Sequence, residues 1–144
     1  MKLNKLYDYP KSTRSIVEGK RHYDIREEKL PSVTTILSAC QSEEKRASLE
    51  AWRQRVGPKT ADLAKDLAAE RGTLMHRYLE AYIDGSGHKD MTPLGEQAEK
   101  MAKQIIESGL RDLGEVWGTE VTLYYPGLYA GQTDVVGVFD GQPA

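Results

Sequence analysis

Cysteine is nearly absent from this chain, since Cys40 is the only one among 144 residues. A single thiol can form neither an internal disulfide nor a zinc cluster, which is typical of proteins in a reducing compartment. Apolar runs are short as well, and none approaches the ~20 residues of a membrane span. The first residues, MKLNKLYDYPK, lack the apolar core of a secretory signal. We therefore expect a cytoplasmic protein that has no membrane partner.

An excess of charge of either sign is also missing. The chain has 20 basic and 22 acidic side chains and a net charge of -2. This balance provides no general attraction to nucleic acid, so any contact with DNA must come from local patches. The length suits one domain, and 39% hydrophobic with 29% charged residues is typical of a globular protein. Phenylalanine occurs once but tyrosine eight times, so most aromatic surface has a hydroxyl group.

The patterns that are present predict helices first and strands afterwards, which is an α+β fold. Residues 1–29 are polar and basic and predict a flexible or loop-rich N-terminal arm, with at most a short hairpin near its end. Order is predicted to begin at 30–37, where Ser32 is a candidate N-cap for a first helical turn. The predicted helices span about 42–56, 58–84 and 93–113. A β-hairpin is predicted over 116–125 and 129–139, because both segments are rich in β-branched and aromatic residues around Pro126-Gly127.

The longest predicted helix has a wide apolar surface. At 100° per residue, its apolar side chains form an arc that predicts burial of more than half of the circumference. The members of this arc are Leu63, Leu67, Ala68, Leu74, Met75 and Leu79. Gly72 lies inside the same helix, where glycine costs about 1 kcal/mol relative to alanine. This cost suggests that another group packs closely against Gly72.

Three polar residues occupy positions where apolar residues would be expected. His76 lies at the edge of the apolar arc, Glu120 lies on the first predicted strand and Asp134 precedes a strongly β-forming run. Each has an ordinary structural explanation: a hydrogen-bonded histidine at the core edge, and two carboxylates in water. Together they could converge at one end of a small sheet. Carboxylate oxygens and an imidazole would suit Mg²⁺ or Mn²⁺, which can activate water against a phosphodiester.

The order of five motifs then gives a resemblance to a known family. The motifs are LPSVTTIL (30–37), LEAWRQRVG (49–57), AAERGTLMHRYLE (68–80), GTEVTLYY (118–125) and AGQTDVVGVFDG (130–141). In this order they resemble the PD-(D/E)XK nuclease superfamily, and within it the RecB-like exonucleases. That group includes phage exonucleases similar to the mitochondrial genome maintenance exonuclease. A phage protein of this kind would work in the host-cell cytoplasm.

The resemblance implies a role for each of the three polar residues. His76 and Asp134 match metal-binding positions, and Glu120 matches the catalytic acidic residue that the preceding strand often carries. The family continues with an Asp/Glu-x-Lys motif on the next strand and a helix, and this sequence ends before both. Residues 30–144 are thus expected to form a partial, C-terminally truncated nuclease domain, the first part of a restriction-endonuclease-like core. We expect weak metal binding, no activity of this chain alone, and self-association through the exposed edge of 129–139.

A basic segment provides a candidate surface for DNA, either single- or double-stranded. Lys45, Arg46, Arg53 and Arg55 surround Trp52 in one short helix, where they could neutralise phosphates while the indole stacks on a base. The alternative is a solvated helix face with Trp52 in the core. The sequence therefore predicts a metal-dependent DNA exonuclease. The alternatives are a non-catalytic nucleic-acid-binding or regulatory module, and a helical interaction domain in which the polar residues are structural.

Overall fold

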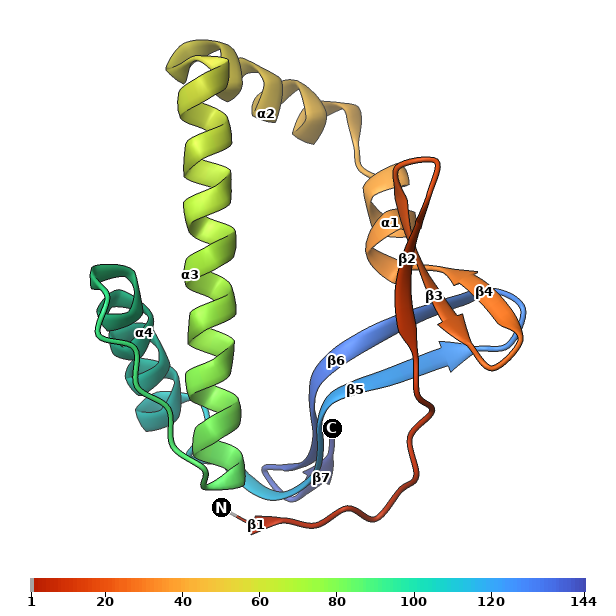
Figure 1. The fold of residues 1–144 in the computed structure, drawn as a ribbon, viewed down its shortest axis with the longest axis vertical. Coiled ribbons are helices and arrows are strands. Elements are labelled where there is room, and N and C mark those ends of the chain that lie inside the picture. The colour runs from red at the N-terminus through yellow and green to blue at the C-terminus, as the bar shows by residue number, and fades with distance from the viewer. Residues whose placement is uncertain (1) are drawn as a thin grey trace.

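The computed structural model describes residues 2–144, which form an α+β fold of four helices and two sheets (Figure 1). The helices are α1 (Val33–Ala39), α2 (Glu43–Val56), α3 (Pro58–Asp84) and α4 (Pro93–Ser108). The strands are β1 (Lys2–Leu3), β2 (Thr13–Val17), β3 (Lys20–Ile25), β4 (Glu28–Pro31), β5 (Leu113–Tyr125), β6 (Tyr129–Phe139) and β7 (Gln142–Pro143). One sheet has the order β1-β5-β6-β7 and the other the order β2-β3-β4.

The helix boundaries follow from local capping signals. Ser32 accepts a hydrogen bond from the N–H of Thr34 at the start of α1, which confirms the predicted N-cap. Helix α3 begins at Pro58 and ends before Gly85, whose φ of 78° suits glycine. The fourth helix is shorter than predicted, because Gly109 caps it through a hydrogen bond to the carbonyl of Ile105. The residues that follow extend β5 instead.

The N-terminal segment is the main correction to the predicted fold. Loops were expected over residues 1–29, but β2, β3 and β4 form an antiparallel sheet there, and β1 pairs in parallel with β5. The short hairpin that was predicted near the end of this arm is present and consists of β3 and β4. The sheet forms because Tyr23 and Ile25 alternate inward on β3 and are buried. With Leu30 and Ala130 they make one hydrophobic core, which joins this sheet to β6.

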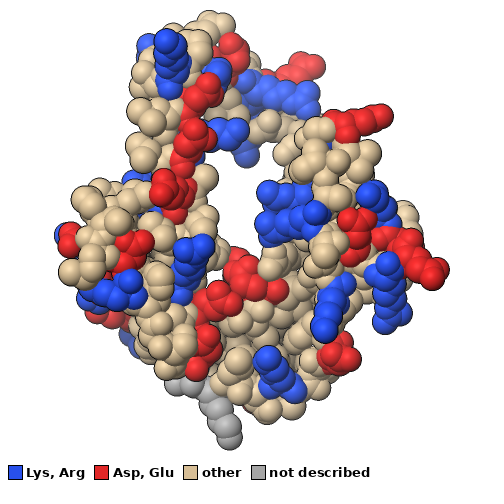
Figure 2. Space-filling view, viewed as in Figure 1, with Lys and Arg blue, Asp and Glu red and all other residues tan. Residues whose placement is uncertain are grey.

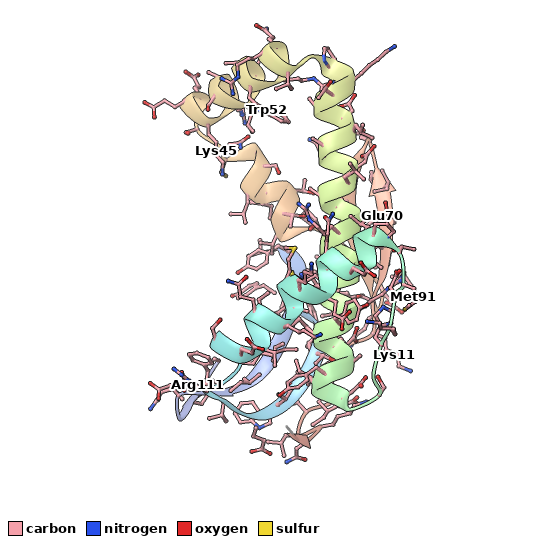
Figure 3. The ribbon with its side chains drawn as sticks, turned by 90° about the vertical axis from the view of Figure 1, so that its left-hand side faces the viewer. Lys11, Lys45, Trp52, Glu70, Met91 and Arg111 are labelled. Atoms are coloured by element: carbon pink, nitrogen blue, oxygen red, sulfur yellow. The ribbon has the colours of Figure 1, made fainter. Side chains whose placement is uncertain are left out.

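The second hydrophobic core lies between α3 and α4 and covers only part of α3. Its buried members are Leu74, Tyr78, Ala98 and Ala102. Figure 3 shows α4 lying across the lower part of α3, while the part that leads to α2 stands clear. There Leu63 is 61% and Leu67 46% exposed, so the prediction of a helix buried on more than half of its circumference is wrong for this part. Periodicity gives the apolar face of a helix, but the cover must come from other elements.

The helices and the two sheets enclose an opening. Helices α3, α2 and α1 run in succession around it, and the β5–β6 hairpin with the N-terminal sheet completes the circuit (Figure 1). Figure 2 shows basic side chains gathered on the side of α1 and the N-terminal sheet, and acidic side chains on the rim below. Within residues 2–144, no helix combines the length and the apolar character needed to cross a membrane.

The outer edge of β6 is partly covered, which the sequence did not predict. Val138 and Phe139 pair with β7, and Gly137 exchanges two backbone hydrogen bonds with Ala144. The turn at Asp140-Gly141 makes this return possible, because both residues have positive φ values. At the other end, Ala130 forms an isolated bridge with Ser32. Among the described residues, 131–136 pair with β5 but have no strand on their other side, so the unpaired outer edge is shorter than expected.

Candidate metal centre

The register of the β5–β6 hairpin brings the two predicted carboxylates together. Thr119 pairs with Val135 and Val121 with Thr133, so Glu120 and Asp134 occupy directly opposed positions between these pairs. Directly opposed residues point to the same face of a sheet. The long helix α3 adds the third group from outside the sheet. His76 Nδ1 lies 3.4 Å from Asp134 Oδ1 and 3.8 Å from Glu120 Oε1.

Placing two carboxylates opposite each other has an electrostatic cost. Like charges at directly opposed positions destabilise a strand pair. Glu120 also has a φ of 51°, in the left-handed region that non-glycine residues rarely adopt within a strand. Both the charge repulsion and the positive φ therefore involve Glu120, and both affect the position of its side chain. A bound cation, or a protonated His76, would offset the repulsion.

The three side chains have the chemistry of a divalent metal site. One ligand atom from each can be chosen so that all lie within 4.8 Å of one another. Carboxylate oxygens suit hard divalent cations such as Mg²⁺ or Mn²⁺, which tolerate one imidazole among their ligands. The side chains are accessible, with exposures of 42% for His76, 36% for Glu120 and 69% for Asp134. A cation held here would therefore keep coordination positions open to water or to substrate oxygens.

Two further residues support the site, and the sequence did not identify them as part of it. Gln132 donates a hydrogen bond of 3.0 Å from Nε2 to the carbonyl of Glu120, and its own amide oxygen accepts one from Arg14. The Arg14 guanidinium also lies 5.8 Å from the ring centroid of Tyr23. Gln132 could have been found, because it is two residues before Asp134 and shares its face. Arg14 gave no signal, since its place depends on distant strand pairing.

A groove of about 490 Å³ surrounds these groups. Its lining residues are Arg14, Gly72, Thr73, His76, Arg77, Glu80, Glu120, Gln132 and Asp134. The interpretation of Gly72 as a point of close packing was wrong, because a Cβ added there would meet no atom within 4 Å. The glycine instead borders the groove one helical turn before His76. The space that a side chain would occupy belongs to the groove.

This arrangement predicts opposite effects of Gly72→Ala on stability and on function. Alanine fits without a clash, so the free energy of unfolding should rise by about 1 kcal/mol, as measured in urea. The added methyl group should at the same time lower the affinity for any ligand that fills the groove. Thr60→Ala, at an exposed position of the same helix outside the groove, serves as the control and should leave ligand affinity unchanged. A stability gain without any change in ligand affinity would show that the space beside Gly72 is not used.

The predicted DNA-binding residues of α2 lie apart from this groove and divide into two pairs. Arg46 donates hydrogen bonds to the carbonyls of Ser38 and Ala39 at the end of α1. Arg53 forms a two-pronged ion pair with Asp62, at 2.7 and 3.3 Å, which holds the pKa of Asp62 below its usual value. Both arginines thus join consecutive helices.

The other two cations of α2 remain available to a ligand. Lys45 and Arg55 are exposed, and within residues 2–144 their side chains form no hydrogen bond or ion pair. Trp52 lies on the same helix and is 37% exposed, so it is not part of a hydrophobic core. Figure 3 shows Lys45 and Trp52 on this helix, away from the sheets. The basic segment therefore offers a ligand fewer free cations than its sequence indicates.

Comparison of the chain with known protein families, with curated proteins and with solved structures finds no match. The functional assignment depends on the geometry of the site. That geometry is two opposed carboxylates and one imidazole beside an open groove.

Proposed function

We propose that His76, Glu120 and Asp134 hold Mg²⁺ or Mn²⁺ and that this centre serves the hydrolysis of phosphodiester bonds in DNA. The observation that carries the proposal is the opposed position of Glu120 and Asp134 between two paired residues on each strand, with the imidazole 3.4 Å from the second carboxylate. Like charges at opposed positions are unfavourable unless a nearby positive charge offsets them, and a bound cation would do so. The motif order that resembles RecB-like exonucleases agrees with this chemistry and adds the choice of DNA.

The chain's own residues would perform three tasks in the reaction. Glu120 and Asp134 hold the cation, and His76 completes the ligand set from the helix. Arg14 and Arg77 line the same groove and supply positive charge for a phosphate group. When bound, the divalent cation supplies a water of lowered pKa and stabilises charge on the phosphate. In the overall reaction, the water oxygen bonds to phosphorus, the ester P–O bond breaks, and a proton passes to the leaving oxygen.

A second candidate function is a non-catalytic nucleic-acid-binding module. It is favoured by the composition of the groove, whose lining includes arginines but no lysine. In the resembled family, a lysine helps to position water or to stabilise charge, and no lysine lines this groove. The expected inactivity of this chain alone remains a prediction.

The test combines metal binding with cleavage by the purified chain. Mn²⁺ binding is followed by its electron paramagnetic resonance signal, and cleavage by incubation with end-labelled single- and double-stranded DNA. We expect weak Mn²⁺ binding that His76→Ala and Asp134→Ala both reduce. Cleavage that requires Mn²⁺ and disappears in both variants would establish the nuclease and contradict the expected inactivity. Mn²⁺ binding without cleavage would favour the binding module, and tight binding that survives both substitutions would place the metal elsewhere.

A further inference from the structure

A large cleft lies beside the metal groove, where the N-terminal segment passes the end of α3. It has a volume of about 1140 Å³, and its lining comes from residues 3–14, from the last turns of α3 and from β5. The cleft and the metal groove share the residues around Glu120. Tyr7, Tyr9 and Trp117 line the cleft but not the groove. Trp117 precedes Glu120 by three residues on β5, which corresponds to roughly 10 Å of strand.

The three aromatic rings form a cluster in this part of the cleft. The ring centroid of Tyr7 is 5.8 Å from that of Trp117, in an edge-to-face arrangement, and 6.2 Å from that of Tyr9. These rings belong to neither of the two hydrophobic cores, and Tyr7 is 57% exposed. Exposed aromatic rings are enriched where proteins bind other molecules. The cluster therefore has the character of a binding surface.

Two polar atoms of the cluster are buried without a partner. Tyr9 Oη and Trp117 Nε1 form no hydrogen bond among the described residues. Buried tyrosine and tryptophan usually pair these groups, and leaving them unpaired weakens the fold. A ligand that brings carbonyl oxygens would supply the acceptors that both groups lack.

The N-terminal segment that carries the two tyrosines is held mainly at its ends. At one end the N–H of Asn4 donates to the carbonyl of Val116 at 2.7 Å. At the other end the hydroxyls of Ser12 and Thr122 are 2.7 Å apart. Between these anchors, residues 5–11 form no backbone hydrogen bond to another segment of the described chain. Backbone without such bonds moves at little cost, so the segment can shift until a ligand reaches the buried donors.

The wall that α3 contributes to the cleft is acidic. Glu80 and Asp84 line the cleft one helical turn apart, near the negative end of the helix. Like charges at this spacing repel each other, and a cationic group of a ligand would offset that repulsion. The charges of Lys5, Asp8 and Lys11 belong to the N-terminal segment, where all three residues are exposed. The α3 wall therefore favours a basic group.

We propose that this cleft binds a proline-rich peptide segment that carries a basic side chain. Polyproline II segments have free carbonyl groups and dock in aromatic-lined grooves. Proline rings pack on the aromatic cluster, the two unpaired donors bond to peptide carbonyls, and the basic side chain reaches the α3 wall. This binding requires no metal.

The spacing of the two walls fixes the spacing within the peptide. Glu80 lines a small cavity together with Thr119, which is two residues beyond Trp117 on β5. Two residues of strand correspond to roughly 7 Å. A polyproline II segment rises 3.1 Å per residue, so about two residues separate the proline on the rings from the basic residue.

The two tryptophans of the chain allow the site to be followed by NMR. Protein labelled with ¹⁵N is titrated in EDTA with the peptide Pro-Pro-Ala-Arg-Pro-Pro, and Trp52→Phe assigns the indole signal that remains to Trp117. This signal should move downfield and saturate, because the indole N–H gains an acceptor. The signal of Trp52, which lies on α2 outside the cleft, should stay in place. A peptide with alanine at every proline should bind at least about tenfold more weakly, because it is not preorganised.

Substitutions separate the three kinds of contact. Tyr9→Phe keeps the ring but removes the hydroxyl group, and should weaken peptide binding about fivefold. Tyr7→Ala removes the exposed ring and should weaken binding about tenfold. Asp84→Asn should weaken binding of the arginine peptide about threefold, but should not change binding of a peptide with alanine in place of arginine. Tyr82→Ala is the matched control, since Tyr82 is 47% exposed and does not line the cleft.

Several results would contradict the peptide site. It would be overturned if the peptide shifts only Trp52 or neither indole signal, or if Tyr9→Phe and Tyr7→Ala both bind it like the wild type. Equal affinity for the alanine peptide would overturn the preference for proline, and equal affinity for a peptide with glutamate in place of arginine would overturn the basic group. An oligothymidylate that shifts the Trp117 signal and displaces the peptide would assign the cleft to nucleic acid and overturn the proposal. The Mn²⁺ titration tests the metal centre separately from all of these results.

Discussion

In the absence of metal, the Asp134→Asn variant should be more stable than the wild type, and in excess Mn²⁺ the order should reverse. The asparagine removes the repulsion from Glu120 at the directly opposed position, which should stabilise the metal-free protein by about 0.2–1 kcal/mol. The wild type should then gain about 2.7 kcal/mol at a Mn²⁺ concentration one hundred times its Kd, and the variant should gain little. Urea unfolding with and without Mn²⁺ measures both effects.

Asp66→Asn provides the control for this reversal. Asp66 is an exposed carboxylate on α3, so its replacement changes the net charge by the same amount without touching the proposed site. It should leave both the metal-free stability and the gain with Mn²⁺ nearly unchanged. If Mn²⁺ fails to stabilise the wild type, or stabilises Asp134→Asn equally, the two opposed carboxylates do not bind this cation. A gain in metal-free stability alone would then reflect only the removal of like charges.

The second large effect is expected from Ile25→Ala, which should destabilise the whole protein by about 2–5 kcal/mol. Ile25 is 0% exposed and lies in the core that joins the N-terminal sheet to β6 through Ala130. Removing its side chain leaves a cavity that the surrounding strands cannot fill. The change should appear as a lower urea midpoint in a single unfolding transition. The effect should include β5 and β6, because they share this core.

Ile16→Ala is the matched control on the adjacent strand. Ile16 is 68% exposed on β2, so the same truncation should cost less than about 0.5 kcal/mol. If Ile25→Ala loosens only residues 13–31, as a separate early transition, the N-terminal sheet is an appendage rather than part of the folding unit. Circular dichroism in the far and near ultraviolet would distinguish a single transition from two.

The elements that were predicted correctly are those whose signals are local. Ser32 and the Gly57-Pro58 pair mark helix ends within a few residues of themselves, and Pro126-Gly127 does so for the hairpin. The N-terminal sheet was missed because its strands are short and polar and become stable only on a core completed by Ala130. The bare part of α3 was missed for a related reason. Its apolar face satisfies the helical pattern, but beyond the buried Ala61 no other element of the described chain covers Leu63 and Leu67.

The residues of the candidate site also divide into those that local sequence signals predict and those that they do not. His76, Glu120 and Asp134 departed from the apolar pattern of their own segments, and the structure brings all three together. Arg14 belongs to a segment without a recognisable period, and its position follows from strand pairings far along the chain. Similarly, Arg53 pairs with Asp62, and Arg46 bonds to the end of α1. The sequence of α2 alone does not predict either partner.

The position of Gly72 also bears on how α3 can bend. The anchored part of the helix begins at Leu74, and the 14 residues from Pro58 to Arg71 extend about 21 Å beyond the glycine. Glycine resists bending less than any other residue, so a bend of about 10° at this point would carry the α2 end through about 4 Å. Arg55 lies near that end, whereas Lys45 lies in the first turn of α2, where Arg46 bonds to the end of α1. Gly72 therefore lies where a bend of α3 would change the width of the opening, beside the proposed metal ligands.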